Sequence, residues 1–265
     1  MQMLFKETKV DPCRFSIKIA GVVVGIKARY SSTYFLCRDY LSDDDPMVYV
    51  STTEEEIDRE IQKSGKFFYT CKEFAGSEKD RNTSREINKS VVEPIVIYRK
   101  IIEELLAFDI LFMHGAAVGT GGRAFLFTAP SGTGKTTHII KWIEHSDNTY
   151  IINGDKPLLR ITDTGVEVCG TPWCGKEYYG ENKTVPLKAI VLMERSEENH
   201  IEEVPFSQTY TFLLRQIHLP EEAEKVKKTI KLLSMLTNRL RFFKFQFNNF
   251  TDDCFDISYN MLTGI

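Results

Sequence analysis

The amino-terminal part of the chain alternates apolar and polar residues with a period of two. Such alternation is typical of half-buried β-strands, and it predicts four short strands here: 15–20, 22–28, 34–38 and 47–50. Thr53 and Glu56 then have the spacing of a capping box, which predicts a helix that begins at Thr53 and runs to about residue 63. We expect residues 1–85 to form a small β-rich accessory module.

The pattern changes after residue 71. Residues 72–90 contain few apolar side chains, and we interpret them as a linker or an exposed loop. From 92 to 108, apolar residues recur every three or four positions, which predicts an amphipathic helix with Pro94 in its first turn. The second predicted domain spans residues 86–265.

Strand and helix patterns follow one another in this second domain. The strand predicted at 124–128 is apolar on both faces, as expected for the centre of a sheet that is covered on both sides. We therefore predict an α/β fold in which a mixed, largely apolar sheet is flanked by helices. The other predicted strands are 111–118, 150–153, 158–161, 166–169, 187–193 and 242–247, and the predicted helices are 136–145, 207–217, 221–239 and 252–262.

Composition and charge narrow the classes of partner. The 265 residues are 42% hydrophobic and 27% charged, and the formal net charge is −3, so no basic surface for nucleic acid is expected. No apolar run is long enough to span a bilayer, and the amino terminus lacks a signal sequence. The six cysteines include no Cys-x-x-Cys pair. We expect a cytoplasmic protein with reduced thiols and no nucleic-acid or membrane partner.

The segment with the strongest chemical signal is 129–137, Ala-Pro-Ser-Gly-Thr-Gly-Lys-Thr-Thr. It lies between a predicted apolar strand and a predicted helix, where a P-loop turns sharply and directs its amide groups at phosphate. Lys135 is expected to reach the β- and γ-phosphates of ATP, and Thr136 to bind Mg²⁺. The motif's usual first glycine is Ala129 here. The predicted nucleotide-binding residues are Ser131, Gly132, Thr133, Gly134, Lys135, Thr136 and Thr137.

A P-loop also needs an acid for the metal, normally at the end of a neighbouring strand. Asp155 follows the strand predicted at 150–153, about 20 residues after the loop lysine. We predict that Asp155 is the metal-associated acid, although an aspartate at a strand end is otherwise most often a turn former. Lys156 is a candidate contact for substrate or phosphate, and an exposed lysine is the alternative.

Two further segments carry candidate residues. Between Gly170 and Lys176, Trp173 suggests a wall for substrate or adenine and Lys176 a phosphate contact, and a packed tryptophan that anchors a loop is the alternative. His114 lies in the strand predicted before the loop strand. If those two strands form a hairpin, we expect His114 well away from the loop end of the ladder, where it could be a core residue.

Taken together, three segments resemble the HPr serine kinase/phosphorylase catalytic domain and its relative, ATP-dependent phosphoenolpyruvate carboxykinase. They are Met113-His114-Gly115, Ser131–Thr136 and Asn153-Gly154-Asp155, and the resemblance covers roughly residues 90–262. It implies a P-loop kinase with an atypical mixed sheet, in which the histidine and an aspartate pair form the phosphoryl-transfer centre. The catalytic residues that it suggests here are His114, Asp155 and Lys135.

The sequence departs from that family at one site residue. Gly154 occupies the position of the first acid of the pair, which the family uses as general base. Asp155 or His114 would then do this work, or the acceptor needs little help. We therefore predict an ATP- and Mg²⁺-dependent kinase that phosphorylates a hydroxyl group of a peptide, a protein serine or a small molecule. The alternatives are a nucleotide-binding regulatory module with weak or lost catalysis and an NTPase that needs no acceptor.

Overall fold

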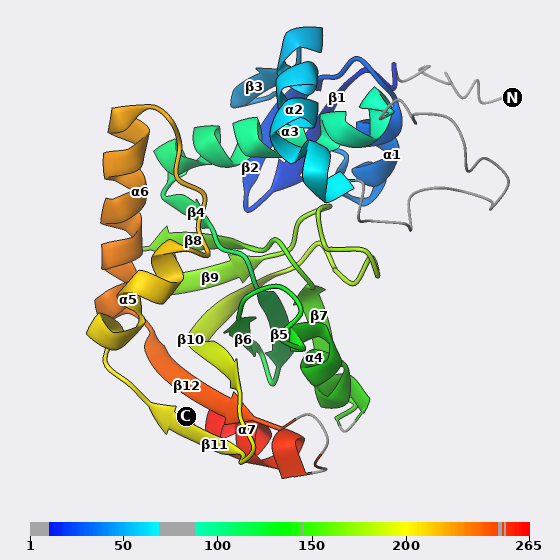
Figure 1. Ribbon diagram of the computed structural model, residues 1–265. Helices are drawn as coiled ribbons and strands as arrows, with labels where there is room; N and C mark the ends of the chain where they lie inside the picture. Colours follow the sequence, from blue (N-terminus) through cyan, green and yellow to red (C-terminus); the bar gives the residue numbers. More distant parts are fainter. Residues whose placement is uncertain (1–10, 69–87, 145, 249–250, 252) are drawn as a thin grey trace, which may run out of the picture. The chain divides into compact units, whose positions relative to one another are not determined.

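The computed structural model describes residues 11–68, 88–144, 146–248, 251 and 253–265 (Figure 1). These residues form two compact units. Described residues up to Lys18, together with Val23–Ile101, make up the first unit, and Ile19–Val22 with Ile102–Ile265 make up the second. The predicted boundary between residues 85 and 86 and most of the predicted 72–90 linker lie outside the described residues, so that boundary stays a prediction.

The first unit contains a three-stranded sheet in the order β1-β2-β3, in which β3 runs parallel to β2. The predicted capping box is confirmed, because Glu56 N–H donates to Thr53 Oγ1 at 3.3 Å and Thr53 N–H donates to Glu56 Oε2 at 2.9 Å. The elements of this unit are β1 (Arg14–Ile19), β2 (Val22–Lys27), α1 (Ser32–Leu36), η1 (Arg38–Tyr40), β3 (Val48–Ser51), α2 (Glu54–Phe68) and most of α3 (Lys89–Leu105).

The strand predicted at 34–38 is wrong. The chain is helical there, in α1 and the following turn of η1. Thr33 and Cys37 are buried whereas Phe35 between them is 62% exposed, so the buried positions are spaced by four residues, as on one side of a helix. The apolar residues of this short segment are compatible with both the two-residue period of a strand and the 3.6-residue period of a helix.

In the described part of the second unit, nine strands form one mixed sheet (Figure 1). Its path is β4-β8-β9-β10-β6-β5-β7, with β12 parallel to β10 and β11 antiparallel to β12. The strands are β4 (Ile110–Phe112), β5 (Ala116–Thr120), β6 (Arg123–Thr128), β7 (Thr149–Asn153), β8 (Leu158–Thr162), β9 (Gly165–Cys169), β10 (Thr184–Arg195), β11 (His200–Glu203) and β12 (Arg241–Phe247).

Helices cover both faces of this sheet. Along β6, Phe125 and Phe127 pack into one core together with α4 and α7, whereas Leu126 packs into a second core with α5 and α6. The prediction of a central strand that is apolar on both faces is thus confirmed, and the fold is mixed α/β. The helices are α4 (Lys135–Glu144), α5 (Phe206–Leu214), α6 (Ala223–Met235), η4 (Leu236–Asn238) and α7 (Asp253–Thr263), and η3 (Leu106–Phe108) ends α3.

The strand predicted at 111–118 is in fact two strands. β4 pairs with β8, whereas β5 pairs with β6 and β7, so the chain changes partners at Met113–Gly115. The apolar run continues through the break because Met113 is fully buried as well. The short polar strand β11 was not predicted. Among the described helices, none combines the length and apolarity needed to cross a bilayer.

Candidate functional site

The glycine-rich loop joins the end of β6 at Thr128 to the start of α4 at Lys135. Gly132 and Gly134 have φ angles of 78° and 114°, which are strained for any residue with a side chain. A Cβ atom on Gly132 would meet nothing within 4 Å, so the backbone conformation, and not a lack of space, requires glycine there. Thr133 closes the turn by donating its hydroxyl to Pro130 O at 2.8 Å.

Lys135 folds back across this loop. Its ammonium group donates to Ala129 O at 2.8 Å and to Pro130 O at 3.4 Å, and the residue is only 9% exposed. Burial lowers the pKa of Lys135, and the negative charge of Asp155 opposes that shift. Two backbone carbonyls at the start of the loop therefore hold the Lys135 ammonium group.

The other residues predicted to bind nucleotide lie in the loop or in the first turn of the helix that follows it. Thr136 and Thr137 belong to the first turn of α4, where Thr136 is half-buried and Thr137 exposed, and Ser131 is exposed in the loop. The first turn of a helix presents amide groups that are not used within the helix, and these favour an anion. Their contacts with a nucleotide stay predictions.

His114 and Asp155 are neighbours. His114 Nε2 lies 3.2 Å from Asp155 Oδ1, and Gly115 N–H donates to Asp155 O at 3.0 Å. The expectation that His114 lies away from the loop end of the hairpin is wrong. β5 pairs Ala116 with Phe127, so the residues before Ala116 reach the end of β6, where Thr128 donates to His114 O at 2.8 Å.

The Asp155 carboxylate is held in its charged form. Burial alone favours the neutral acid, but the hydrogen bond from His114 and the adjacent Lys156 ammonium outweigh it, and together they hold the pKa of Asp155 well below its ordinary value. Lys156 Nζ contacts Asp155 Oδ2 directly. An anionic side chain thus lies at the carboxyl end of β7.

Asn153, to which the sequence pattern assigned no role of its own, positions this acid. Its side-chain oxygen accepts hydrogen bonds from the N–H groups of Asp155 at 2.9 Å and Lys156 at 2.6 Å. Its amide group donates to Thr171 O at 3.1 Å and is fully buried. An asparagine before Gly-Asp at a strand end is a turn signal that could have indicated this role.

Gly154, the position where the resembled family has its first acid, is closely packed. A Cβ atom there would lie 2.8 Å from Cys174 O and 3.3 Å from Tyr179 O, and both are backbone atoms. Gly154 N–H also donates to Tyr179 O at 2.9 Å. The 170–181 segment therefore takes the space that an acidic side chain would need.

Gln216 is a second residue that sequence reasoning missed. Its side-chain oxygen lies 2.9 Å from His114 Nδ1, and its backbone carbonyl accepts the His114 N–H at 2.7 Å. Both imidazole nitrogens thus face oxygen atoms, an arrangement that a doubly protonated ring satisfies by donating twice. A neutral ring would need the Gln216 amide group turned, so Gln216 can serve either protonation state.

The two candidate substrate contacts in the 170–176 segment, Trp173 and Lys176, differ in their exposure to solvent. Trp173 is 8% exposed, and its carbonyl accepts from Asn153 at 3.5 Å, which matches the packed anchor among the two interpretations. Lys176 is exposed. Cys174 is half-buried, and burial raises the pKa of its thiol. The contacts of Trp173 and Lys176 with a substrate stay predictions.

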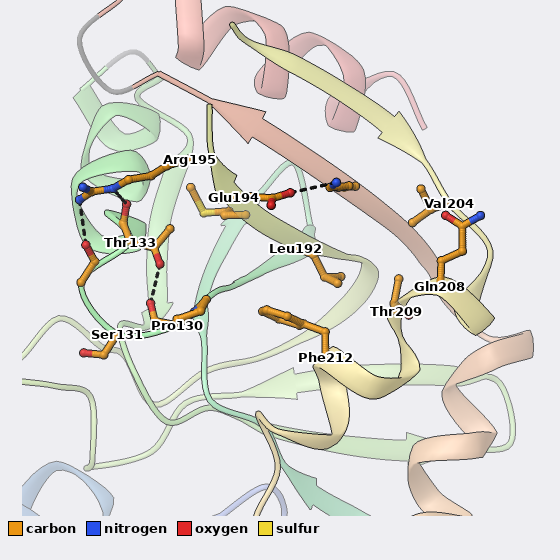
Figure 2. A pocket seen from close by; sticks show the side chains of 13 residues that line it. Pro130, Ser131, Thr133, Leu192, Glu194, Arg195, Val204, Gln208, Thr209 and Phe212 are labelled. Carbon is orange, nitrogen blue, oxygen red and sulfur yellow. Dashed lines mark hydrogen bonds and ion pairs between the residues drawn. The ribbon is translucent and has the colours of Figure 1, made fainter. Parts of the chain in front are cut away.

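Arg195, at the end of β10, supports the loop from outside (Figure 2). Its guanidinium donates to Thr133 O at 3.0 Å and Gly132 O at 2.9 Å. The C=O and N–H of a trans peptide point in opposite directions, so holding Thr133 O fixes the direction of the Gly134 N–H. No motif in the sequence indicated this arginine.

We expect Arg195→Ala to weaken the predicted ATP binding about fivefold, because two charge-assisted hydrogen bonds that orient the loop are lost at an exposed position. Fluorescence titration with an ATP analogue measures the effect. Arg241→Ala is the matched control, since Arg241 makes an exposed ion pair with Glu203 at 2.5 Å on the neighbouring strands. Equal affinity of the Arg195→Ala variant and the wild type would contradict the orienting role.

No protein-family model matches the sequence, and no curated protein matches it. Among solved structures, the chain is similar to the HPr(Ser) kinase/phosphatase from Coxiella burnetii, with a TM-score of 0.36 and 7% sequence identity over 58% of this chain and 91% of that one.

Proposed function

We propose that the second unit is an ATP- and Mg²⁺-dependent kinase that transfers the γ-phosphate to a hydroxyl group of a peptide, a protein serine or a small molecule. The observation that carries the proposal is the convergence of the glycine-rich loop, Lys135 and the His114–Asp155 pair at the ends of β6 and β7. Phosphoryl transfer depends mainly on positioning and on neutralising charge, and these groups supply both.

In this proposal the loop amides and Lys135 hold the phosphates. Thr136 and Asp155 would hold Mg²⁺, and the anionic state of Asp155 suits a hard cation that is usually bound by one or two carboxylates together with substrate phosphates. When bound, the ion would neutralise negative charge on the phosphates.

The reacting hydroxyl would approach beside His114 and Asp155. A bond forms between its oxygen and the γ-phosphorus as the bond from that phosphorus to the β–γ bridging oxygen breaks, and ADP leaves. The hydroxyl proton passes to the His114–Asp155 pair, where an imidazolium would be stabilised by the carboxylate at 3.2 Å.

A second candidate is a nucleotide-binding regulatory module without turnover. The close packing of Gly154 favours it, because the structure has no room for a second acid at the position where the resembled family has its base. An acceptor-independent NTPase would use the same loop.

One assay separates the three functions. ADP formation from Mg-ATP is measured with and without a panel of serine peptides and small hydroxyl compounds. The kinase predicts ADP and phosphorylated acceptor in equal amounts, and the NTPase predicts ADP and free phosphate without any acceptor. Saturable ATP binding with no ADP under either condition would contradict the kinase and support the regulatory module.

A further inference from the structure

A groove of about 730 Å³ opens beside the glycine-rich loop, within the second unit (Figure 2). Residues 130–133 of the loop form one side, and the end of β10 forms its floor. Residues of α5 line the opposite side, and Lys244 of β12 is also a lining residue.

The groove has an apolar interior. The half-buried Phe212 ring of α5 extends into the space between Pro130 and Leu192 (Figure 2). Leu192 is itself half-buried, and Val204 closes the apolar wall with 9% of its surface exposed. A flat aromatic face with aliphatic neighbours is well suited to stacking against a planar ring.

Polar groups line the rim of the groove. Gln208 is exposed there on α5, and Lys244 pairs with Glu194 at 2.9 Å. Arg195 joins this rim to the loop through its bonds to Gly132 and Thr133 (Figure 2). A few polar groups around an apolar pocket are the usual means of orienting a small ligand.

We propose that this groove binds the base and ribose of the nucleotide whose phosphates lie on the loop. This inference rests on the proposed nucleotide binding. Residues 130–133 line the groove and also belong to the loop proposed to hold the phosphates, so the groove and the loop adjoin. His114, Asp155 and Lys156 are not among its described lining residues, so a hydroxyl acceptor bound in it would be away from the groups proposed to receive its proton.

The test compares two ligands that differ in the nucleoside. Affinities for Mg-ATP and for Mg-tripolyphosphate, which has no base or ribose, are measured by calorimetry on the full chain. Phe212→Ala is expected to weaken ATP binding about tenfold, because a stacking face is lost, and to leave tripolyphosphate binding unchanged. Phe212→Tyr keeps the ring and is expected to retain ATP affinity.

Two further variants make the test robust. Phe35→Ala removes a 62% exposed ring in the other unit and is expected to change neither affinity. Gln208→Ala, at an exposed position, is expected to weaken ATP binding about threefold even if Phe212→Ala fails to fold. Equal effects of the groove variants on both ligands, or no effect on ATP, would overturn the base site while leaving nucleotide binding intact. A wild type that binds neither ligand would overturn the proposed function itself.

Discussion

Replacing Asp155 by asparagine is expected to reduce the proposed phosphoryl transfer by roughly 10²- to 10⁴-fold, the range found when a group that assists proton transfer is lost. The variant keeps the size of the side chain but removes the negative charge that faces His114 Nε2 at 3.2 Å. It also weakens the proposed metal site. Turnover is measured as ADP formed with a hydroxyl acceptor at saturating Mg-ATP.

Asp163→Asn is the matched control for this experiment. Asp163 is exposed in the turn between β8 and β9, so the same change of charge there is expected to leave turnover within about twofold of the wild type. If Asp155→Asn and Asp163→Asn have equal turnover, the His114–Asp155 pair is not the reacting centre.

Gly170→Ala is expected to destabilise the protein by about 3 kcal/mol, at the upper end of the usual cost of overpacking. The added Cβ would lie 1.9 Å from Glu181 O and 2.9 Å from Ile152 O, and neither backbone oxygen can move without opening the contact of the 170–181 segment with β7. Glu181 N–H donates to Ile152 O at 3.1 Å in that contact. Urea unfolding measures the change in free energy.

Gly165→Ala is the control that tests whether the loss of stability is specific to position 170. A Cβ on Gly165 meets nothing within 4 Å, and its φ is not in the left-handed region, so little change in stability is expected. Because Asn153 ties the same segment to Asp155, Gly170→Ala is also expected to lower turnover in the fraction that stays folded. Equal stability of the two variants would contradict the close packing.

Much of the fold could be predicted because its strands have strong periods. β6 is apolar on both faces and lies at the centre of two cores, as its composition predicted. The break between β4 and β5 could not be predicted, since Met113 stays buried where the chain changes sheet partners. The helix α1 was mistaken for a strand because five residues are too few to separate the two periods.

Only those parts of the candidate site that are formed by residues adjacent in the sequence could be predicted. The glycine-rich loop and Lys135 follow from adjacent residues, whereas the contact between His114 and Asp155 depends on pairing among β5, β6 and β7. Gln216 and Arg195 reach the site from positions 102 and 62 residues away from their partners. A single glutamine or arginine belongs to no recognisable local motif, so the roles of Gln216 and Arg195 become visible only in the folded structure.

Calorimetric titration of the protein with Mg-ATP, repeated with Lys135→Ala and Lys227→Ala, tests nucleotide binding most directly. Lys227 is an exposed lysine paired with Glu224, so its variant is expected to bind as the wild type does. We predict saturable binding with one site per chain in the wild type and in Lys227→Ala. The affinity of Lys135→Ala is expected to be about 10- to 100-fold weaker, because one charge-assisted phosphate contact is lost. No binding heat in the wild type at any accessible concentration, or equal affinity in all three proteins, would contradict a nucleotide site at this loop.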